Sequence, residues 1–207
     1  MKRTKTLPLL SLGAVAMLLM SCIDVDAKIT LANNGSGEVD IVYRVSRLVM
    51  NLGGAEKDRS QLPLPVAEDD FTRTIRAIDG LALKRYTRAD DEDKTTITAS
   101  LTFADVKALG ALLGGDRDSI SLASEGGKTV FRLLLVPGNP DQLDAKTKEF
   151  FQSFFNSYGL NYSLAAPSAV KSTNLKEASV NGNEAKIRIP ILTAVETKDP
   201  IVWRVEW

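Results

Sequence analysis

The sequence predicts an α+β fold: an antiparallel sheet built from β-hairpins, with helices packed on one face and a β-rich C-terminal part. Two observations lead to this prediction. Apolar and polar residues alternate in several segments separated by turn sequences, which is the period of a half-buried strand. Between these segments lie stretches with helical spacing that end in glycines, and helices inserted among hairpins favour an antiparallel sheet.

The first element after residue 22 is a β-hairpin. Polar and apolar residues alternate over 24–31 and again over 39–45. The sequence between them, Asn33-Asn34-Gly35-Ser36-Gly37, consists largely of residues that tolerate the positive φ of tight turns. Each strand therefore has one apolar face for a core and one polar face for solvent.

A short helix and two similar units follow the hairpin. Acidic residues at 68–70 favour the N-terminal end of a helix, Phe71, Ile75 and Ile78 have helical spacing, and Gly80 ends the helix. Each unit then consists of strand, turn, strand and helix. Their predicted elements are 81–88, the acidic turn 90–93, 97–103 and a helix over 104–113, then 118–124, the turn 125–127, 130–136 and a helix over 140–158.

The tail from 160 to 207 is predicted to be entirely β. Asn181-Gly182-Asn183 marks a turn, and the last strand places Ile201, Trp203, Val205 and Trp207 on one face. We therefore expect a single α+β domain over 22–207, or two closely packed halves at 22–158 and 159–207. Without a disulfide, a chain of this length can still bury a sufficient core.

Residues 1–21 have the character of a signal peptide. Three basic residues among the first five precede the apolar segment 7–20, which is too short to cross roughly 30 Å of hydrocarbon as a helix. The stretch Leu19-Met20-Ser21-Cys22 resembles the lipobox of bacterial lipoproteins, although Met20 occupies a position that more often carries a small or β-branched residue. The resemblance implies cleavage before Cys22 and its acylation with chains such as palmitate, which makes the membrane a partner of the protein.

The residue after Cys22 bears on the membrane that holds the anchor. In many diderm bacteria an Asp at this position keeps a lipoprotein in the inner membrane, whereas this chain has Ile23 there and Asp24 one position later. The resemblance to lipoproteins therefore favours the outer membrane over the inner one, with the body in the cell envelope, in the periplasm.

Composition argues against several classes of function. The chain has no histidine and a single cysteine, which removes the commonest general base, thiolate zinc clusters and intramolecular disulfides. Without the signal peptide it carries 23 basic and 26 acidic residues, a net charge of −3, so nucleic acid is not an expected partner. The acidic turn 90–93 lacks the ligand spacing of a calcium loop and is expected to be a solvated hairpin tip. We expect no metal, no cofactor and no enzymatic activity.

The predicted helix over 140–158 carries the candidate ligand-binding residues. Phe150, Phe151, Phe154 and Phe155 lie in it and are four of the seven phenylalanines of the chain. They either pack on the sheet, where aromatic rings bury a large area, or line a lipid-sized pocket between helix and sheet.

The layout of the mature chain resembles the LppM-type lipoprotein domain and similar envelope lipoproteins. The matching features are Cys22 followed directly by a hairpin with a Gly-Ser-Gly turn, the segment 166–174, a Gly-Asn turn and a final strand with tryptophans. The resemblance implies a role at the envelope surface, with lipid or glycolipid as ligand, and offers no catalytic residues.

These observations lead to one leading hypothesis and two alternatives. The leading one is a non-enzymatic, lipid-anchored envelope protein that binds a hydrophobic or lipidic ligand or docks on an envelope protein. The main alternative is a structural or assembly component of the outer membrane, which acts through protein contacts such as an exposed patch at Trp203 and Trp207. The third is a hydrolase that uses paired carboxylates.

Overall fold

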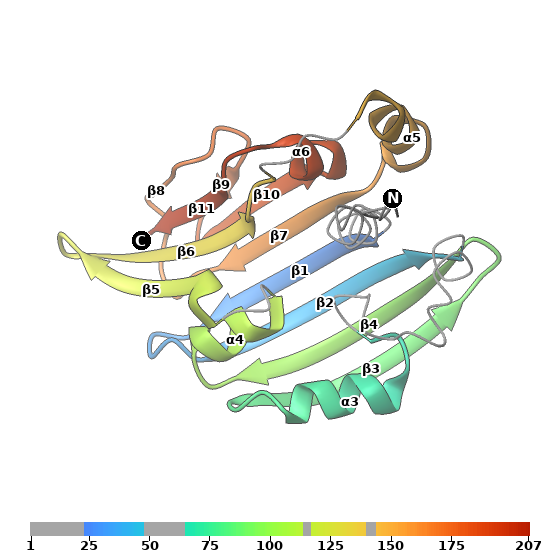
Figure 1. The fold of residues 1–207 in the computed structure, drawn as a ribbon. Coiled ribbons are helices and arrows are strands. Elements are labelled where there is room, and N and C mark those ends of the chain that lie inside the picture. The colour runs from blue at the N-terminus through green and yellow to red at the C-terminus, as the bar shows by residue number, and fades with distance from the viewer. Residues whose placement is uncertain (1–22, 48–64, 114–116, 140–143) are drawn as a thin grey trace, which may run out of the picture.

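The computed structural model describes residues 23–47, 65–113, 117–139 and 144–207, which contain four α-helices and eleven strands (Figure 1). The strands of the larger sheet are β1 (Ile23–Leu31), β2 (Gly37–Ser46), β3 (Leu81–Asp90), β4 (Lys94–Phe103), β7 (Gly159–Ala165), β9 (Ser179–Asn181) and β10 (Glu184–Pro190). The strands of the smaller sheet are β5 (Ile120–Glu125), β6 (Lys128–Val136), β8 (Ser172–Thr173) and β11 (Ile201–Glu206). The helices are α3 (Glu68–Arg76), α4 (Val106–Leu113), α5 (Ala145–Phe155) and α6 (Ile191–Glu196).

The fold is α+β, as predicted, but it contains two sheets rather than one. The larger sheet has the order β3-β4-β2-β1-β7-β10-β9, and the smaller has the order β5-β6-β11-β8. The second hairpin unit, β5 and β6, therefore pairs with the C-terminal strand and not with the first unit. Alternation in the sequence predicts the face that a strand buries, but the same alternation is compatible with many partner strands.

The prediction of a purely antiparallel sheet is wrong at one pair of strands. β1 and β7 run parallel, with Val25 opposite Leu160 and Thr30 opposite Ala165, whereas the other pairs are antiparallel. A parallel pair requires a long crossover connection, and here β2 to β6 and α5 lie between the two strands in the chain. Strands from both ends of the chain thus form one sheet.

The first hairpin has the predicted strands and turn. β1 and β2 pair from Ile23 opposite Val45 to Leu31 opposite Gly37. Gly35 has a φ of +82°, which is the conformation that the turn sequence predicts. The apolar positions of both strands, from Ala27 to Leu31 and from Val39 to Val45, are buried.

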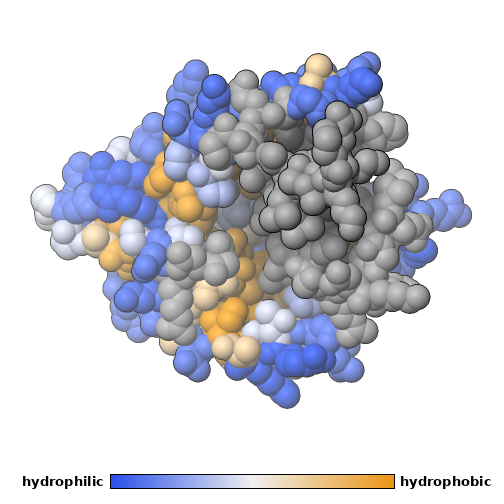
Figure 2. All heavy atoms as spheres, in the orientation of Figure 1, coloured by the Kyte–Doolittle hydropathy of each residue, from blue (hydrophilic) through white to orange (hydrophobic). Residues whose placement is uncertain are grey.

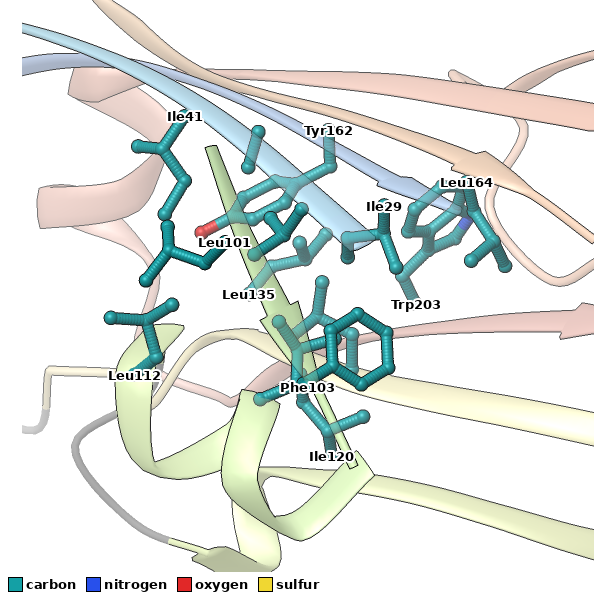
Figure 3. Close-up of a cluster of buried hydrophobic side chains, with 14 of the residues drawn as sticks. Ile29, Ile41, Leu101, Phe103, Leu112, Ile120, Leu135, Tyr162, Leu164 and Trp203 are labelled. Atoms are coloured by element: carbon teal, nitrogen blue, oxygen red, sulfur yellow. The ribbon is translucent and has the colours of Figure 1, made fainter. Parts of the chain in front are cut away.

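The core lies between the two sheets (Figure 3). The larger sheet contributes Ile29, Ile41 and Leu101, α4 contributes Leu112, and β11 contributes Trp203. Trp203 is fully buried, and its indole N–H donates to Thr173 Oγ1 at 3.0 Å. The predicted inward face of the last strand therefore packs in the core. Figure 2 shows the side on which α4 and β6 lie, where apolar residues gather near these elements and polar residues surround them.

α3 adds to the core at the β3–β4 side of the larger sheet. It buries Phe71 and Ile75, and the Phe71 ring lies 5.1 Å from that of Tyr86 in β3. The hydroxyl of Tyr43 in β2 donates to the Pro65 carbonyl, just before this helix. The apolar spacing of this segment therefore predicts the face that the helix buries.

The helix predicted over 140–158 and the all-β tail predicted from 160 both differ from the structure. The second long helix spans Ala145–Phe155. Asp144 caps its N-terminus and accepts the backbone N–H groups of Lys146 and Thr147 at 2.9 and 3.0 Å. The tail is not entirely β, because α6 interrupts it. Pro190 lies directly before α6, a position that proline tolerates at a helix start, and buried Ile191 begins this helix rather than extending β10.

Candidate functional site

The face of the larger sheet that is turned away from the core is polar. Its side chains alternate with the buried ones, so that Lys28 is exposed between the buried residues Ala27 and Ile29. The same alternation places Asp40 of β2 and Lys186 of β10 on this face, where both are exposed. Ordinary solvation explains a polar sheet face, and a binding role therefore requires a concave shape in addition.

A groove with a volume of about 450 Å³ lies on this polar face. We call it the outer groove. Its floor comes from β2, β1, β7 and β10, and one side comes from the chain just before β9 and its first residue. Its polar floor residues are Asp26, Lys28, Asp40, Asn161, Ser163, Lys186 and Arg188. Glu177 and Ser179 form the side.

Lys28 lies at the middle of the floor. In the strand register it is opposite Asp40 in β2 and opposite Ser163 in β7. Asp40 accepts a hydrogen bond from Ser100 Oγ at 2.5 Å. Within the described parts of the chain, no hydrogen bond or ion pair engages the Lys28 ammonium, whose charge acts on the Glu184 carboxylate from a greater distance. The Lys28 ammonium is therefore available as a donor to a ligand in the groove.

Hydrogen bonds orient the groups around Lys28. The Arg188 guanidinium donates to Asn161 Oδ1 at 3.2 Å and to the Ser157 carbonyl at 2.7 Å. Ser163 Oγ donates to Glu184 at 2.8 Å, and Lys186 pairs with the same carboxylate at 2.9 Å. The hydrogen bond from Lys186 holds the pKa of Glu184 below its ordinary value, so that this carboxylate stays ionised. The floor is thus an ordered array of donors and acceptors.

A further ion pair supports the groove at the start of β1. Arg44 Nη1 donates to Asp26 Oδ2 at 2.7 Å and to Asp24 Oδ2 at 2.8 Å. Both hydrogen bonds raise the pKa of Arg44, and the one that Arg44 donates to Asp26 is the largest cause. Asp26 therefore faces the groove as a carboxylate that is already paired on one side.

The charges that line the outer groove balance. Lys28, Lys186 and Arg188 are cationic, and Asp26, Asp40 and Glu177 are anionic. Such a surface has no net attraction for a multiply charged anion such as a nucleotide. It suits a neutral ligand that both donates and accepts hydrogen bonds.

The described residues offer little to the other classes of site. They contain no group of three or more acidic or cysteine residues that could hold a metal ion. The carboxyl groups with a resolved pKa shift are all lowered by hydrogen bonds or ion pairs, whereas a catalytic acid needs a raised pKa. They are Asp90, Asp91, Asp144, Glu184 and Glu206. In the acidic turn, Asp91 accepts the backbone N–H groups of Asp93 and Lys94 and so stabilises the turn itself.

The residues singled out by the sequence fall wholly or partly outside the described part of the chain. Cys22 and the predicted signal peptide 1–21 fall outside the described residues. Phe150, Phe151, Phe154 and Phe155 belong to α5, but their side chains are also outside the described part, so the pocket beside them stays a prediction.

Sequence reasoning missed the outer groove because its residues come from distant segments. Alternation at 24–30 and at 184–190 indicates the solvent-facing positions, among them Lys28 and Lys186. It does not indicate that β7 lies between β1 and β10, because that order depends on the parallel pairing. A sequence signal for the individual positions therefore exists, but none for the site.

The fold and the groove define a two-sheet α+β domain in which one face of the larger sheet packs on the core and the other is exposed.

Within the described ranges, no helix combines the length and the apolar character needed to cross a membrane. No protein-family model and no curated protein matches the sequence. Among solved structures, the chain is similar to the folded domain of LppM from Mycobacterium tuberculosis, determined by NMR. The two are 15% identical, with 89% of this chain and 88% of that chain covered, at a TM-score of 0.45.

Proposed function

We propose that the protein is a non-enzymatic, lipid-anchored binding protein of the cell envelope, whose outer groove holds a neutral, hydroxyl-rich ligand such as a saccharide. The observation that carries this proposal is the groove of about 450 Å³ with a charge-balanced floor. The lipobox at 19–22 supports the anchor.

The chemistry of the floor matches that of a saccharide. Sugar hydroxyls donate and accept at once, so Asp40 can accept from them while Lys28 and Asn161 donate to them. The volume falls in the range of small-molecule sites, roughly 300–1,000 Å³. The aliphatic stems of Lys28 and Lys186, together with Val42, supply the apolar surface that the C–H groups of a sugar ring can contact.

Two sources in the envelope present this chemistry: the headgroup of a glycolipid and an envelope polysaccharide. Lys28 lies six residues after Cys22, which corresponds to about 20 Å of extended strand at about 3.3 Å per residue. A groove at that distance from the anchor is accessible to either source. The lipidic ligand expected from the sequence would then be a glycolipid whose sugar headgroup binds in the outer groove.

Native mass spectrometry of the acylated chain in detergent micelles tests the proposal and separates the two sources. The chain is mixed in parallel with a glycolipid extract of its own envelope, with the saccharides released from that extract, and with oligosaccharides from the envelope polysaccharide. A retained adduct identifies the source by its mass. If none of the three mixtures gives an adduct, the binding function is wrong.

A pair of lysine substitutions assigns the adduct to the groove. Lys28→Met removes the central donor, whereas Lys84→Met changes an exposed lysine of β3 that pairs with Glu38 at 2.7 Å outside the groove. A hydrogen bond from a charged group contributes about 1.5–3 kcal/mol, so Lys28→Met is expected to weaken binding by about 10- to 100-fold. Lys84→Met is expected to leave binding unchanged, and equal effects would place the ligand elsewhere.

The alternative functions gain no support from the described residues. Trp203 is buried in the core and Trp207 is half-buried, and the exposed large apolar side chains of the described residues are Val180 and Val202. Two valines do not make the patch that a protein interface needs. The hydrolase interpretation gains nothing from Asp90, Asp91, Asp144, Glu184 or Glu206, because hydrogen bonds lower the pKa of each of these carboxyl groups.

A further inference from the structure

One end of the domain contains both the start of β1 and the start of β7. The two strands are parallel, so residues just before each of them lie at the same end of the larger sheet. The Gly159 N–H donates to Asp24 Oδ1 at 3.2 Å, which joins the two starts directly. Asp24 lies two residues after Cys22, and β1 already begins at Ile23. We call this end of the domain, defined by Asp24 and Gly159, the anchor end.

α5 lies at the anchor end as well. It ends at Phe155, four residues before Gly159, and four residues span at most about 14 Å of extended chain. Among the described elements, α5 packs mainly against α6, and Lys148 pairs with Glu196 of that helix at 3.4 Å. Figure 1 shows α5 at the margin of the molecule, beyond the start of β7. This helix is therefore peripheral to both sheets.

The composition of α5 is unusual for a peripheral helix. Four of its eleven residues are phenylalanine, and Lys146 and Lys148 lie in its first turn. The α5 residues whose side chains are described are all exposed or half-buried, including Lys146 and Gln152. Aromatic residues together with lysines are typical of helices that lie in the headgroup region of a bilayer.

We infer that α5 is a second membrane contact and lies in the headgroup region of the bilayer that holds the Cys22 acyl chains. This inference rests on the proposed lipid anchor. The bilayer is the expected neighbour because the chain outside the structure ends at Cys22, directly before β1, and leaves no linker. A body tethered in this way has its anchor end against the lipid surface. Two contacts, the acyl chains and α5, then orient the body instead of letting it swing.

The inference makes a geometric prediction about the two ends of β1. Nine residues of strand span about 30 Å at about 3.3 Å per residue, so the turn after Leu31 lies far from the anchor end. Ser153 on α5 should lie in the lipid headgroups, and Asn33 in the distant turn should lie in water. Both side chains are exposed, which makes them suitable positions for a label.

Depth-dependent fluorescence quenching of the acylated, full-length mature chain tests this prediction. Cys22 is the only cysteine and is blocked by acylation, so Ser153→Cys or Asn33→Cys provides a single thiol for an environment-sensitive fluorophore. The labelled chains are placed in phosphatidylcholine–phosphatidylglycerol vesicles with nitroxide lipids. We expect a blue shift and strong quenching at 153 and neither at 33. A third chain, Ser153→Cys with Phe150→Gln and Phe154→Gln, should lose much of the quenching.

The outcomes separate the inference from the proposed function. The mass of the purified chain shows whether Cys22 carries acyl chains. An acylated chain whose label at 153 is quenched no more than the label at 33 overturns the membrane contact of α5 and leaves the anchor intact. A chain that reaches the envelope without acyl chains on Cys22 overturns both.

Discussion

The two faces of the seven-stranded sheet differ in almost every physical property, although the same strands form both. The inner face is apolar and is covered by the smaller sheet, α3 and α4. The outer face is charged, open to solvent and hollowed by the outer groove. Stability and the proposed ligand binding should therefore depend on alternating residues of the same strand. Substitutions one position apart should then affect one and not the other.

The largest expected difference between the faces is at neighbouring positions of β1. Ile29→Ala should lower the free energy of unfolding by about 2–5 kcal/mol, because Ile29 is fully buried and the substitution leaves a cavity. Lys28→Ala should change it by no more than about 0.5 kcal/mol, because the side chain is exposed. Urea denaturation of both variants measures the difference. Equal losses in the free energy of unfolding would show that the outer face contributes as much to stability as the inner face.

The pKa of Tyr162 tests whether water reaches the inner face of the larger sheet. Burial raises the pKa of Tyr162 to about 12, whereas an unfolded tyrosine has a pKa of about 10. The folded state therefore holds the phenolic proton more tightly, and its stability is unaffected below about pH 10 and falls as the pH rises from about 10 to about 12. The loss amounts to about 3 kcal/mol for a shift of about two pKa units.

Stability measured by urea denaturation between pH 9 and 12 checks this expectation. Tyr162→Phe should reduce the loss of stability at high pH. Tyr43→Phe should in addition lower the free energy of unfolding by about 1 kcal/mol at neutral pH, because it removes the hydrogen bond to the Pro65 carbonyl. If Tyr162→Phe leaves the loss of stability at high pH unchanged, water reaches the Tyr162 side chain in the folded protein.

The smallest expected effect concerns two carboxylates on the outer face. Asp24→Ala should cost about 1–2 kcal/mol, because its side chain is 22% exposed and accepts hydrogen bonds from Arg44 and from the Gly159 N–H. Asp26→Ala should cost less than about 1 kcal/mol, because this side chain is 43% exposed and shares the same arginine. Thermal unfolding of the two variants ranks them. The reverse order would mean that the groove, rather than the anchor end, holds this face together.

Local features of the fold were accessible to prediction from the sequence. The three hairpins β1–β2, β3–β4 and β5–β6 pair strands that are adjacent in the chain, and the turn residues between them indicate the pairing. The helical spacing of Phe71 and Ile75 predicts the buried face of α3 in the same way. α6 was not predicted, because Ile191 continues the alternation of β10 although Pro190 begins a new element.

The composition of the outer groove was not accessible to such reasoning. Lys28, Ser163 and Lys186 occupy solvent-facing positions that alternation identifies one by one, yet they meet only because β7 lies between β1 and β10. The period of a strand is a property of neighbouring residues, whereas the order of strands depends on contacts between segments more than 100 residues apart, such as Asp24 and Gly159.

The amino-acid sequence alone decided the α+β class, the inward residues of most strands and the prediction of an acylated Cys22, because each depends on short-range patterns of side chains. The tertiary structure alone decided that there are two sheets, that the outward side chains of the larger sheet are exposed in the described part of the chain, and that α5 ends four residues before Gly159, whose N–H donates to Asp24. These features follow from the parallel pairing of β1 with β7, which no local pattern encodes, because backbone hydrogen bonds between strands are nearly the same for any partner.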